Sequence, residues 1–262
     1  MTGCIRRAKK VRERRRTRVP DPDFIIIGAP RCGTSVFYRL LCRHPKIKYV
    51  PKKEIHFFDW NHERGLEWYL SQFGHVPEER IVGEATPRYL AHPEVPERMV
   101  RVLPDVKLIV LLRNPVDRAY SHYHLLRRRG LEEEFEAVLE TERGWLEENS
   151  LEDPSAPTNL LTTGIYVEHL KRWHRHYPRE QLLVLKSEDF YARPRRALST
   201  TREFLGLPEH RFNLRIRRAR HEYAPMNPET RKELVRFFRP YNEELYDYLG
   251  RSFGWEESEE AA

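Results

Sequence analysis

The chain has 262 residues, of which 33% are charged and 39% hydrophobic, a size and composition suited to one globular domain with a sizeable core. Its three cysteines, Cys4, Cys32 and Cys42, form no Cys-x-x-Cys pair, which excludes a disulfide framework and gives no sign of a zinc site. The chain has no apolar run of about 18 residues and no apolar signal core, so the sequence predicts neither a membrane span nor a secretory signal.

The positive net charge of +7 comes from the N-terminal segment. Residues 1–18 contain nine Lys or Arg and one Glu, which leaves the rest of the chain at −1. We expect a disordered, solvated basic tail there; peripheral contact with anionic lipid, nucleic acid or a polyanionic glycan is the alternative. An acidic tail is expected over 253–262, and a single folded domain over 19–252.

The first predicted elements are a buried strand over 24–27 and a helix over 33–43, joined by a Gly-bounded loop. Such a loop presents backbone N–H groups to an anion at the start of the helix. A nucleoside-triphosphate P-loop has Lys and Ser/Thr after its second Gly, whereas Thr34 and Ser35 follow Gly33 here. The cation of this loop is Arg31. A P-loop nucleotide kinase or NTPase remains the alternative within enzymes.

Two segments downstream of this loop carry candidate catalytic residues. The segment over 51–59 reads Pro-Lys-Lys-Glu-Ile-His-Phe-Phe-Asp and contains Lys53 and His56. A short strand expected over 81–83 ends at Glu84. A carboxylate at the end of a strand is held by the scaffold, and it is a suitable general base. His56 is the competing base, because an ordinary imidazole titrates near neutral pH.

The strand-to-helix pattern occurs again downstream. An apolar run over 108–112 ends in Arg113, and Pro115 stands where the first turn of a helix over 115–129 begins. Arg113 and Ser121 can converge on one dianion, since Arg supplies a planar fork of donors and Ser a short hydroxyl.

The remaining pattern predicts one α/β domain with a P-loop-like parallel sheet and helices on both faces. A fourth strand is expected over 182–185, and the acidic stretch 132–157 is expected to be a mobile excursion over the acceptor side. Further helices are expected over 94–103, 164–177, 194–205 and 228–249. The ligand should bind beyond the carboxyl ends of the strands.

The two loops together resemble the signatures of sulfotransferases that use 3′-phosphoadenosine 5′-phosphosulfate (PAPS). The Lys-Glu-x-His-Phe-Phe run is similar to the heparan-sulfate, carbohydrate-modifying (Golgi-type) branch, whose animal members carry an N-terminal span; a soluble bacterial-type member is expected here. The resemblance implies that the first loop binds the 5′-phosphosulfate and that Arg113 and Ser121 bind the 3′-phosphate. It also implies a basic loop over the nucleotide, although Ala224 interrupts the usual aromatic-Pro pair. The implied donor-binding residues are Pro30, Arg31, Cys32, Gly33, Thr34, Ser35, Arg113, Ser121, Arg218, Arg220 and His221.

The resemblance implies transfer of a sulfuryl group to a hydroxyl or amine, with adenosine 3′,5′-bisphosphate as the second product and no metal. Glu84 would be the base, with Arg31 and Lys53 stabilising the leaving oxygen and His56 as the second-ranked base. The acceptor can be a carbohydrate, a glycolipid or a small molecule. We expect a cytoplasmic protein without a specific nucleic-acid partner; the sequence does not indicate an oligomeric state. A non-catalytic polyanion binder acting through the tail is the alternative outside enzymes.

Overall fold

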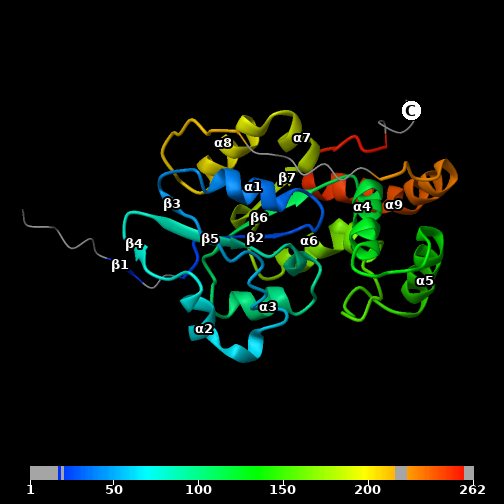
Figure 1. Cartoon of the computed structure of the whole chain (residues 1–262), viewed down its shortest axis with the longest axis horizontal. Helices are drawn as coiled ribbons and strands as arrows, with labels where there is room; N and C mark the ends of the chain where they lie inside the picture. The colour runs from blue at the N-terminus through cyan, green and yellow to red at the C-terminus, as the bar shows by residue number, and fades with distance from the viewer. Residues whose placement is uncertain (1–16, 19–20, 216–222, 257–262) are drawn as a thin grey trace, which may run out of the picture.

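A five-stranded parallel sheet forms the centre of the protein, as a computed structural model shows (Figure 1). The structure describes residues 17–18, 21–215 and 223–256. The strand order is β3-β5-β2-β6-β7, and each neighbouring pair is parallel. The four strands expected from the sequence are all present. The strands of this sheet are β2 (Phe24–Gly28), β3 (Ile47–Lys48), β5 (Ile81–Ala85), β6 (Lys107–Leu112) and β7 (Leu182–Lys186).

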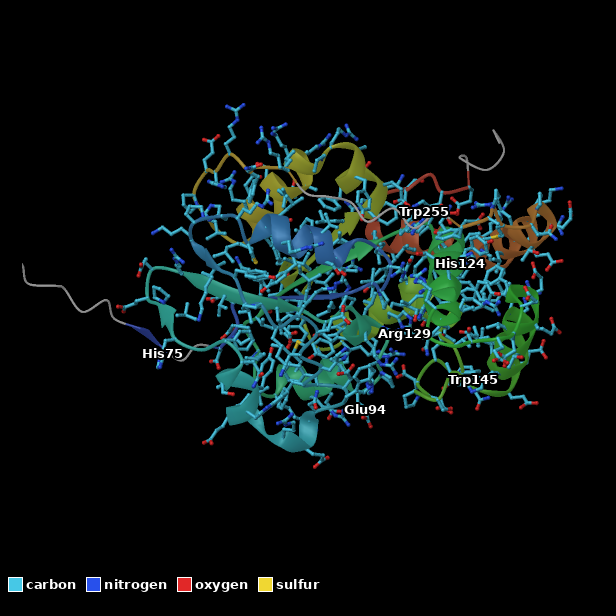
Figure 2. All side chains as sticks on the ribbon, viewed as in Figure 1. His75, Glu94, His124, Arg129, Trp145 and Trp255 are labelled. Carbon is cyan, nitrogen blue, oxygen red and sulfur yellow. The ribbon has the colours of Figure 1, made fainter. Side chains whose placement is uncertain are left out.

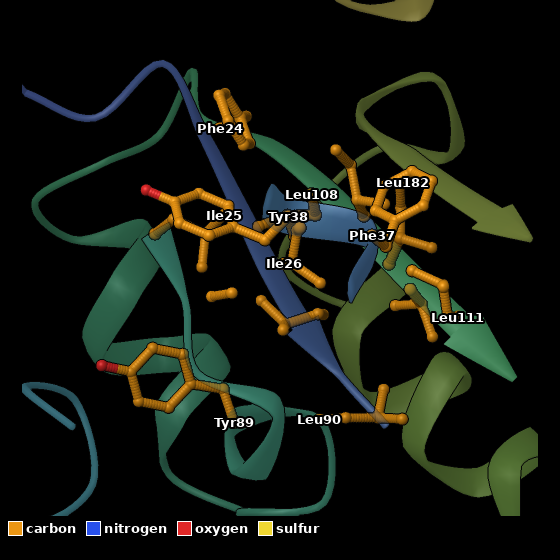
Figure 3. Packing of buried hydrophobic residues seen from close by; sticks show 14 of the residues in the cluster. Phe24, Ile25, Ile26, Phe37, Tyr38, Tyr89, Leu90, Leu108, Leu111 and Leu182 are labelled. Atoms are coloured by element: carbon orange, nitrogen blue, oxygen red, sulfur yellow. The ribbon is translucent and has the colours of Figure 1, made fainter. Parts of the chain in front are cut away.

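Strand β2 occupies the middle of the sheet because it is apolar on both faces. Every residue of β2 is buried, and Ile25 lies beside Glu84 of β5 on one side and Leu108 of β6 on the other. Figure 3 shows Phe37 and Tyr38 of the following helix among the side chains that pack around this strand. The register therefore brings the carboxyl ends of β2, β5 and β6 to one edge.

Helices cover both faces of the sheet, which confirms the expected fold class (Figure 1). One face carries α1 (Thr34–Leu41), α7 (Ser187–Ala192) and α8 (Pro194–Phe204). The other carries α2 (Leu66–Ser71), α3 (Val95–Val100) and α6 (Tyr166–His174). Short 3₁₀ turns lie at His62–Arg64, Pro87–Leu90, Thr162–Gly164 and Arg179–Gln181.

A second apolar cluster joins three helices at one end of the molecule: α4 (Pro115–Arg127), α5 (Phe135–Glu148) and α9 (Pro228–Leu249). The prediction of a mobile excursion over 132–157 is wrong for Phe135–Glu148, which form α5. Phe135, Val138 and Leu139 have helical spacing and are buried in this cluster, so packing holds the acidic segment in a helix.

The two ends of the folded part differ from the expected boundaries. Thr17–Arg18 forms β1, which pairs antiparallel with β4 (Val76–Pro77). The sequence predicts instead that Thr17 and Arg18 belong to the basic tail. Phe253 and Trp255 are buried in the main core, so the fold continues past residue 252. Residues 1–16 and 257–262 of the two expected tails lie outside the described residues. No helix in the described ranges is long and apolar enough to cross a membrane.

Gly28 ends β2 at a point of close packing. A Cβ at this position would lie 2.4 Å from Leu90 Cβ, and Leu90 lies beside the carboxyl end of β2 (Figure 3). We predict that Gly28→Ala lowers the free energy of unfolding by about 1–3 kcal/mol, because the added methyl overpacks the core. Chemical denaturation measures this loss.

Removing the obstructing side chain tests the cause of that loss. In the Gly28→Ala background, Leu90→Gly should cost less than it does in the parent, since only glycine removes the Leu90 Cβ that the new methyl would meet. Gly144→Ala in α5 is the control, because no atom lies within 4 Å of its added Cβ and stability should not fall. Additive effects of Gly28→Ala and Leu90→Gly would contradict the overpacking explanation.

Candidate active site

A loop over residues 29–33, the predicted phosphate loop, leaves β2 and leads into α1 at the edge where the strands end. Gly33 adopts φ +86°, and a Cβ there would lie 2.5 Å from the Tyr191 hydroxyl, so both conformation and space favour glycine. Hydrogen bonds within α1 begin at Val36 and Phe37, whose amides both donate to the Gly33 carbonyl. The preceding amides of Thr34 and Ser35 are those that a helix start leaves for an anion.

Arg31 joins this loop to the second predicted phosphate motif. Its Nε donates to Ser121 Oγ at 3.1 Å, and Arg113 Nη1 donates to the Arg31 carbonyl at 3.4 Å. Burial lowers the pKa of Arg31, and the nearby cations Arg128 and Arg113 lower it further, against an opposing effect of Tyr223. The structure therefore gathers positive charge where both motifs predicted a bound anion.

Lys53 reaches the same loop from the segment between β3 and β5. Its Nζ donates to Ser35 Oγ at the start of α1 and to Glu54 Oε1 at 2.8 Å. Glu54 is half-exposed and its pKa is lowered to about 2, chiefly by hydrogen bonding with His56 and also by Lys53. Lys53 is therefore placed as a second cation beside the phosphate loop.

Arg31, Glu54 and His56 have φ of +70°, +59° and +54°, the left-handed region that non-glycine residues rarely adopt. Strained backbone of this kind persists where surrounding contacts hold it, and it is common at functional sites. Within the described residues, Asn159 at φ +58° is the other non-glycine residue in this region, so three of the four lie in the two segments that supply Arg31, Lys53 and His56.

Glu84 lies near the end of β5, as predicted, but its carboxylate does not project into open space. The side chain is 1% exposed, and its oxygens accept hydrogen bonds from Thr86 Oγ1 at 2.6 Å, Tyr69 Oη at 3.1 Å and Tyr89 Oη at 3.4 Å. Burial raises the pKa of Glu84 to about 7, although the Thr86 and Tyr69 hydroxyls favour the charged form. Glu84 therefore titrates near neutral pH beneath a layer of hydroxyl groups.

His56 is held between two carboxylates. Nδ1 lies 2.9 Å from Asp59 Oδ2 and Nε2 lies 3.7 Å from Glu54 Oε2, while the ring stacks on Trp60 with centroids 3.9 Å apart. Burial opposes its charge, but the hydrogen bonds with Asp59 and Glu54 prevail and raise the pKa of His56 to about 9. At neutral pH this imidazole is in its charged form, with a proton on each nitrogen, which makes it a poor proton acceptor.

Cys32 contributes its backbone rather than its thiol to the loop. The side chain is buried, with Sγ 3.7 Å from the Pro30 carbonyl and 3.9 Å from Tyr166 Oη. Burial raises the pKa of this thiol to about 11. The Ser187 hydroxyl donates to the Cys32 carbonyl at 2.9 Å and so fixes the loop from the end of β7.

The predicted donor contacts Arg218, Arg220 and His221 lie outside the described residues. The chain on both sides of them is fixed. Arg43 Nη2 donates to the Arg215 carbonyl at 2.9 Å, and His124 of α4, labelled in Figure 2, stacks on Tyr223 with centroids 4.1 Å apart.

Two buried charged residues, Glu142 and Arg118, hold the loop over 159–162. The sequence did not single out either of them as a site residue. Glu142 accepts hydrogen bonds from the amides of Leu160, Leu161 and Thr162 at 2.7, 3.1 and 3.0 Å. Arg118, which is fully buried, donates to the carbonyls of Asn159 and Leu160. Arg118 stands in the second phosphate motif, whereas nothing in the sequence pattern distinguished Glu142 from its acidic neighbours.

A cavity of about 50 Å³ lies beside the phosphate loop. Pro30 forms part of its wall, and other parts come from the turn after β5, from α4, from α5 and from the loop before α6. Trp145, labelled in Figure 2, reaches it from α5. The polar and charged residues of the lining are Arg88, His92, His122, Asp153, Asn159, Thr162, Thr163 and His169.

Fold and site together define an α/β protein with a helix start and a group of cationic side chains at the carboxyl ends of its parallel strands. The chain belongs to the sulfotransferase domain family, which matches residues 21–238. This match confirms the family resemblance that rested on the two phosphate motifs.

Known relatives support this assignment. The crystal structure of a sulfotransferase from Alicyclobacillus acidocaldarius has a TM-score of 0.77 at 31% identity, covering 90% of this chain and 99% of that one. Human heparan sulfate glucosamine 3-O-sulfotransferase 3B1 is 32% identical over 90% of this chain and 65% of its own length. The membrane-associated sulfotransferase kil1 of Dictyostelium discoideum is 28% identical over 95% of this chain and 71% of its own. The chain thus spans less than two thirds of the human relative.

Burial of Glu84 predicts a pH-dependent effect on stability. Because its folded pKa of about 7 lies above the ordinary 4.5, the stability that Glu84 contributes is complete below pH 4.5 and is lost as the pH rises through 7. Relative to the parent, Glu84→Gln should gain about 3 kcal/mol in free energy of unfolding between pH 4.5 and pH 8. Chemical denaturation across this range measures the difference.

Glu67→Gln, on the exposed surface of α2, is the control for that series. Comparison with the parent at each pH removes the contribution of His56, which titrates in both proteins. A difference between Glu84→Gln and the parent that stays constant with pH would show that the pKa of Glu84 is not raised.

Proposed function

We propose that this protein transfers a sulfuryl group from PAPS to a hydroxyl group of a carbohydrate acceptor. The observation that carries the proposal is the hydrogen bond from Arg31 Nε to Ser121 Oγ, with Arg113 beside it. It joins two motifs that lie 90 residues apart into one cationic site. Family membership supplies the reaction class.

In the proposed complex the loop over 30–35 holds the 5′-phosphosulfate. The amides of Gly33, Thr34 and Ser35 face the anion, while Arg31 and Lys53 supply positive charge. Arg113 and Ser121 bind the 3′-phosphate. Pro30 and Cys32 shape the loop through their backbone, and Arg218, Arg220 and His221 remain proposed contacts to the same nucleotide.

The reaction is an in-line displacement at sulfur. The acceptor oxygen forms a bond to sulfur as the bond between sulfur and the bridging phosphate oxygen breaks. Lys53 and Arg31 stabilise the negative charge that grows on this leaving oxygen. Glu84 takes the proton of the acceptor hydroxyl, and adenosine 3′,5′-bisphosphate leaves as the second product.

A pKa of about 7 favours Glu84 as the base, because proton transfer is most efficient when the pKa is near the working pH. The burial of Glu84 requires that the acceptor hydroxyl displace a hydroxyl of the covering layer, either Thr86 or Tyr69. His56 is the weaker candidate, since it already carries a proton that Asp59 holds.

The acceptor class is proposed from the relatives and from the cavity. Several relatives are named as sulfotransferases of heparan sulfate glucosamine. The cavity combines hydroxyl, amide and imidazole groups with the Trp145 ring, which are groups that can contact a substituent of a sugar. A glycolipid or a small hydroxylated molecule is the alternative acceptor, and a cytoplasmic location stays a prediction.

Binding measurements distinguish this proposal from a nucleotide kinase or NTPase. Isothermal titration calorimetry should show binding of adenosine 3′,5′-bisphosphate without metal and weaker binding of ATP with magnesium. Arg113→Ala should weaken the bisphosphate by about tenfold to a hundredfold, since it removes a charged hydrogen-bond donor. Tight binding of ATP alone would contradict the proposed donor.

The same measurement addresses the polyanion-binder alternative. Deleting residues 1–16 removes the basic tail up to β1 and leaves every described contact of the nucleotide site in place. Affinity for the bisphosphate should persist in that variant. Its loss would indicate that the tail, rather than the folded site, binds the anion.

Glu84→Gln tests the catalytic base. We expect kcat to fall by about 10²–10⁴-fold, because the amide cannot accept the proton, while affinity for adenosine 3′,5′-bisphosphate is unchanged. In the parent, kcat/KM should rise with pH through about 7, where Glu84 loses its proton. Steady-state assays with labelled PAPS and heparan sulfate oligosaccharides measure both.

His56→Gln is the matched variant, because it replaces the competing base with glutamine, the residue also introduced at Glu84. It should retain the rise of kcat/KM near pH 7. Parent-like turnover by Glu84→Gln, or loss of that pH-dependent rise in His56→Gln, would reassign the base to another group.

A further inference from the structure

Arg88 extends from the turn that follows the strand of the candidate base. Its neighbours Pro87, Tyr89 and Leu90 are buried in the 3₁₀ turn Pro87–Leu90, whereas the Arg88 side chain is 39% exposed. The core therefore fixes the backbone of Arg88 four residues after Glu84 and directs one charged side chain outward.

The guanidinium of Arg88 is held in place but only loosely paired. It lies 5.2 Å from the Trp60 ring centroid, and its Nε lies 3.7 Å from Asp59 Oδ2. That carboxylate already contacts His56 Nδ1 at 2.9 Å and accepts from the Trp60 amide through Oδ1 at 2.9 Å. Within the described residues, Arg88 Nε is buried without a hydrogen-bond partner.

Arg88 also lines the cavity whose wall includes Pro30 of the phosphate loop. Three imidazoles share this lining, and burial lowers the pKa of each. The pKa falls to about 3 for His122 and His169, and it is also lowered for His92. They are uncharged at neutral pH. Arg88 is thus the positive charge of the described lining, and Asp153 on an exposed loop is the negative one.

We propose that Arg88 determines acceptor specificity by binding an anionic group, a carboxylate or a sulfate, on the sugar chain that receives the sulfuryl group. The inference rests on the proposed function and adds to it the charge of the acceptor. The loosely paired guanidinium supplies a planar fork of donors that matches such a group. Trp60, which is 63% exposed, supports the guanidinium while leaving its outer edge accessible.

The test compares the parent with Arg88→Gln on three oligosaccharides of equal length. The first is an unsulfated glucuronate–N-acetylglucosamine oligosaccharide, the second is its uncharged methyl ester, and the third is an N-acetylated, O-sulfated oligosaccharide with esterified uronates. Calorimetry in the presence of adenosine 3′,5′-bisphosphate gives the affinities, and sulfate transfer gives kcat/KM.

We expect the parent to prefer at least one charged oligosaccharide over the uncharged ester by about tenfold to a hundredfold, and Arg88→Gln to lose that preference. The charged oligosaccharide that is preferred identifies the group. Equal affinity of the parent for all three, or a preference that survives in Arg88→Gln, overturns the inference.

Arg64→Gln is the control, because Arg64 also lies over a tryptophan ring, 4.1 Å from the Trp68 centroid, but does not line the cavity. It should retain the parent's preference. Affinity for adenosine 3′,5′-bisphosphate should be the same in all three proteins. A parent that fails to bind the bisphosphate would contradict the proposed function itself, an outcome distinct from a change in acceptor preference.

Discussion

The hydrogen bond between Arg31 and Ser121 is the contact on which the site depends. It requires the loop after β2 and the helix after β6 to meet, and they meet because β2 and β6 are adjacent and parallel. The apolar character of both strands places them at the centre of the sheet. A property of the core thus determines where the cations lie.

The placement of charge follows from the same architecture. Cations gather at the strand ends, where helix-start amides also favour an anion, whereas the carboxylate of Glu84 is one layer deeper and contacts hydroxyl groups. This separation leaves Arg31 and Lys53 unpaired with Glu84. Lys53 pairs instead with Glu54, and the Glu84 carboxylate keeps a pKa at which it can exchange a proton.

Much of this arrangement was predictable, because the determining signals are local. The apolar runs identified four strands of the parallel sheet, and the spacing of Arg31, Arg113 and Ser121 identified residues that the fold brings together. The hydroxyl layer over Glu84 was not predictable, since Tyr69 comes from a short helix that only tertiary contacts fix. Helix α5 has a helical apolar spacing, but its many acidic residues concealed it. The loose pairing of Arg88 depends on side-chain contacts that no sequence pattern reports.

The layer of hydroxyl groups over Glu84 affects hydrolysis of the donor when no acceptor is bound. A carboxylate in contact with solvent would activate water, and the donor would be hydrolysed in the absence of an acceptor. With its oxygens occupied by Thr86, Tyr69 and Tyr89, Glu84 is shielded from bulk water. If Glu84 is the base, as proposed, an acceptor reaches it by replacing one of those hydroxyls with its own. In the proposed reaction, the idle enzyme therefore protects its donor from futile hydrolysis until an acceptor arrives.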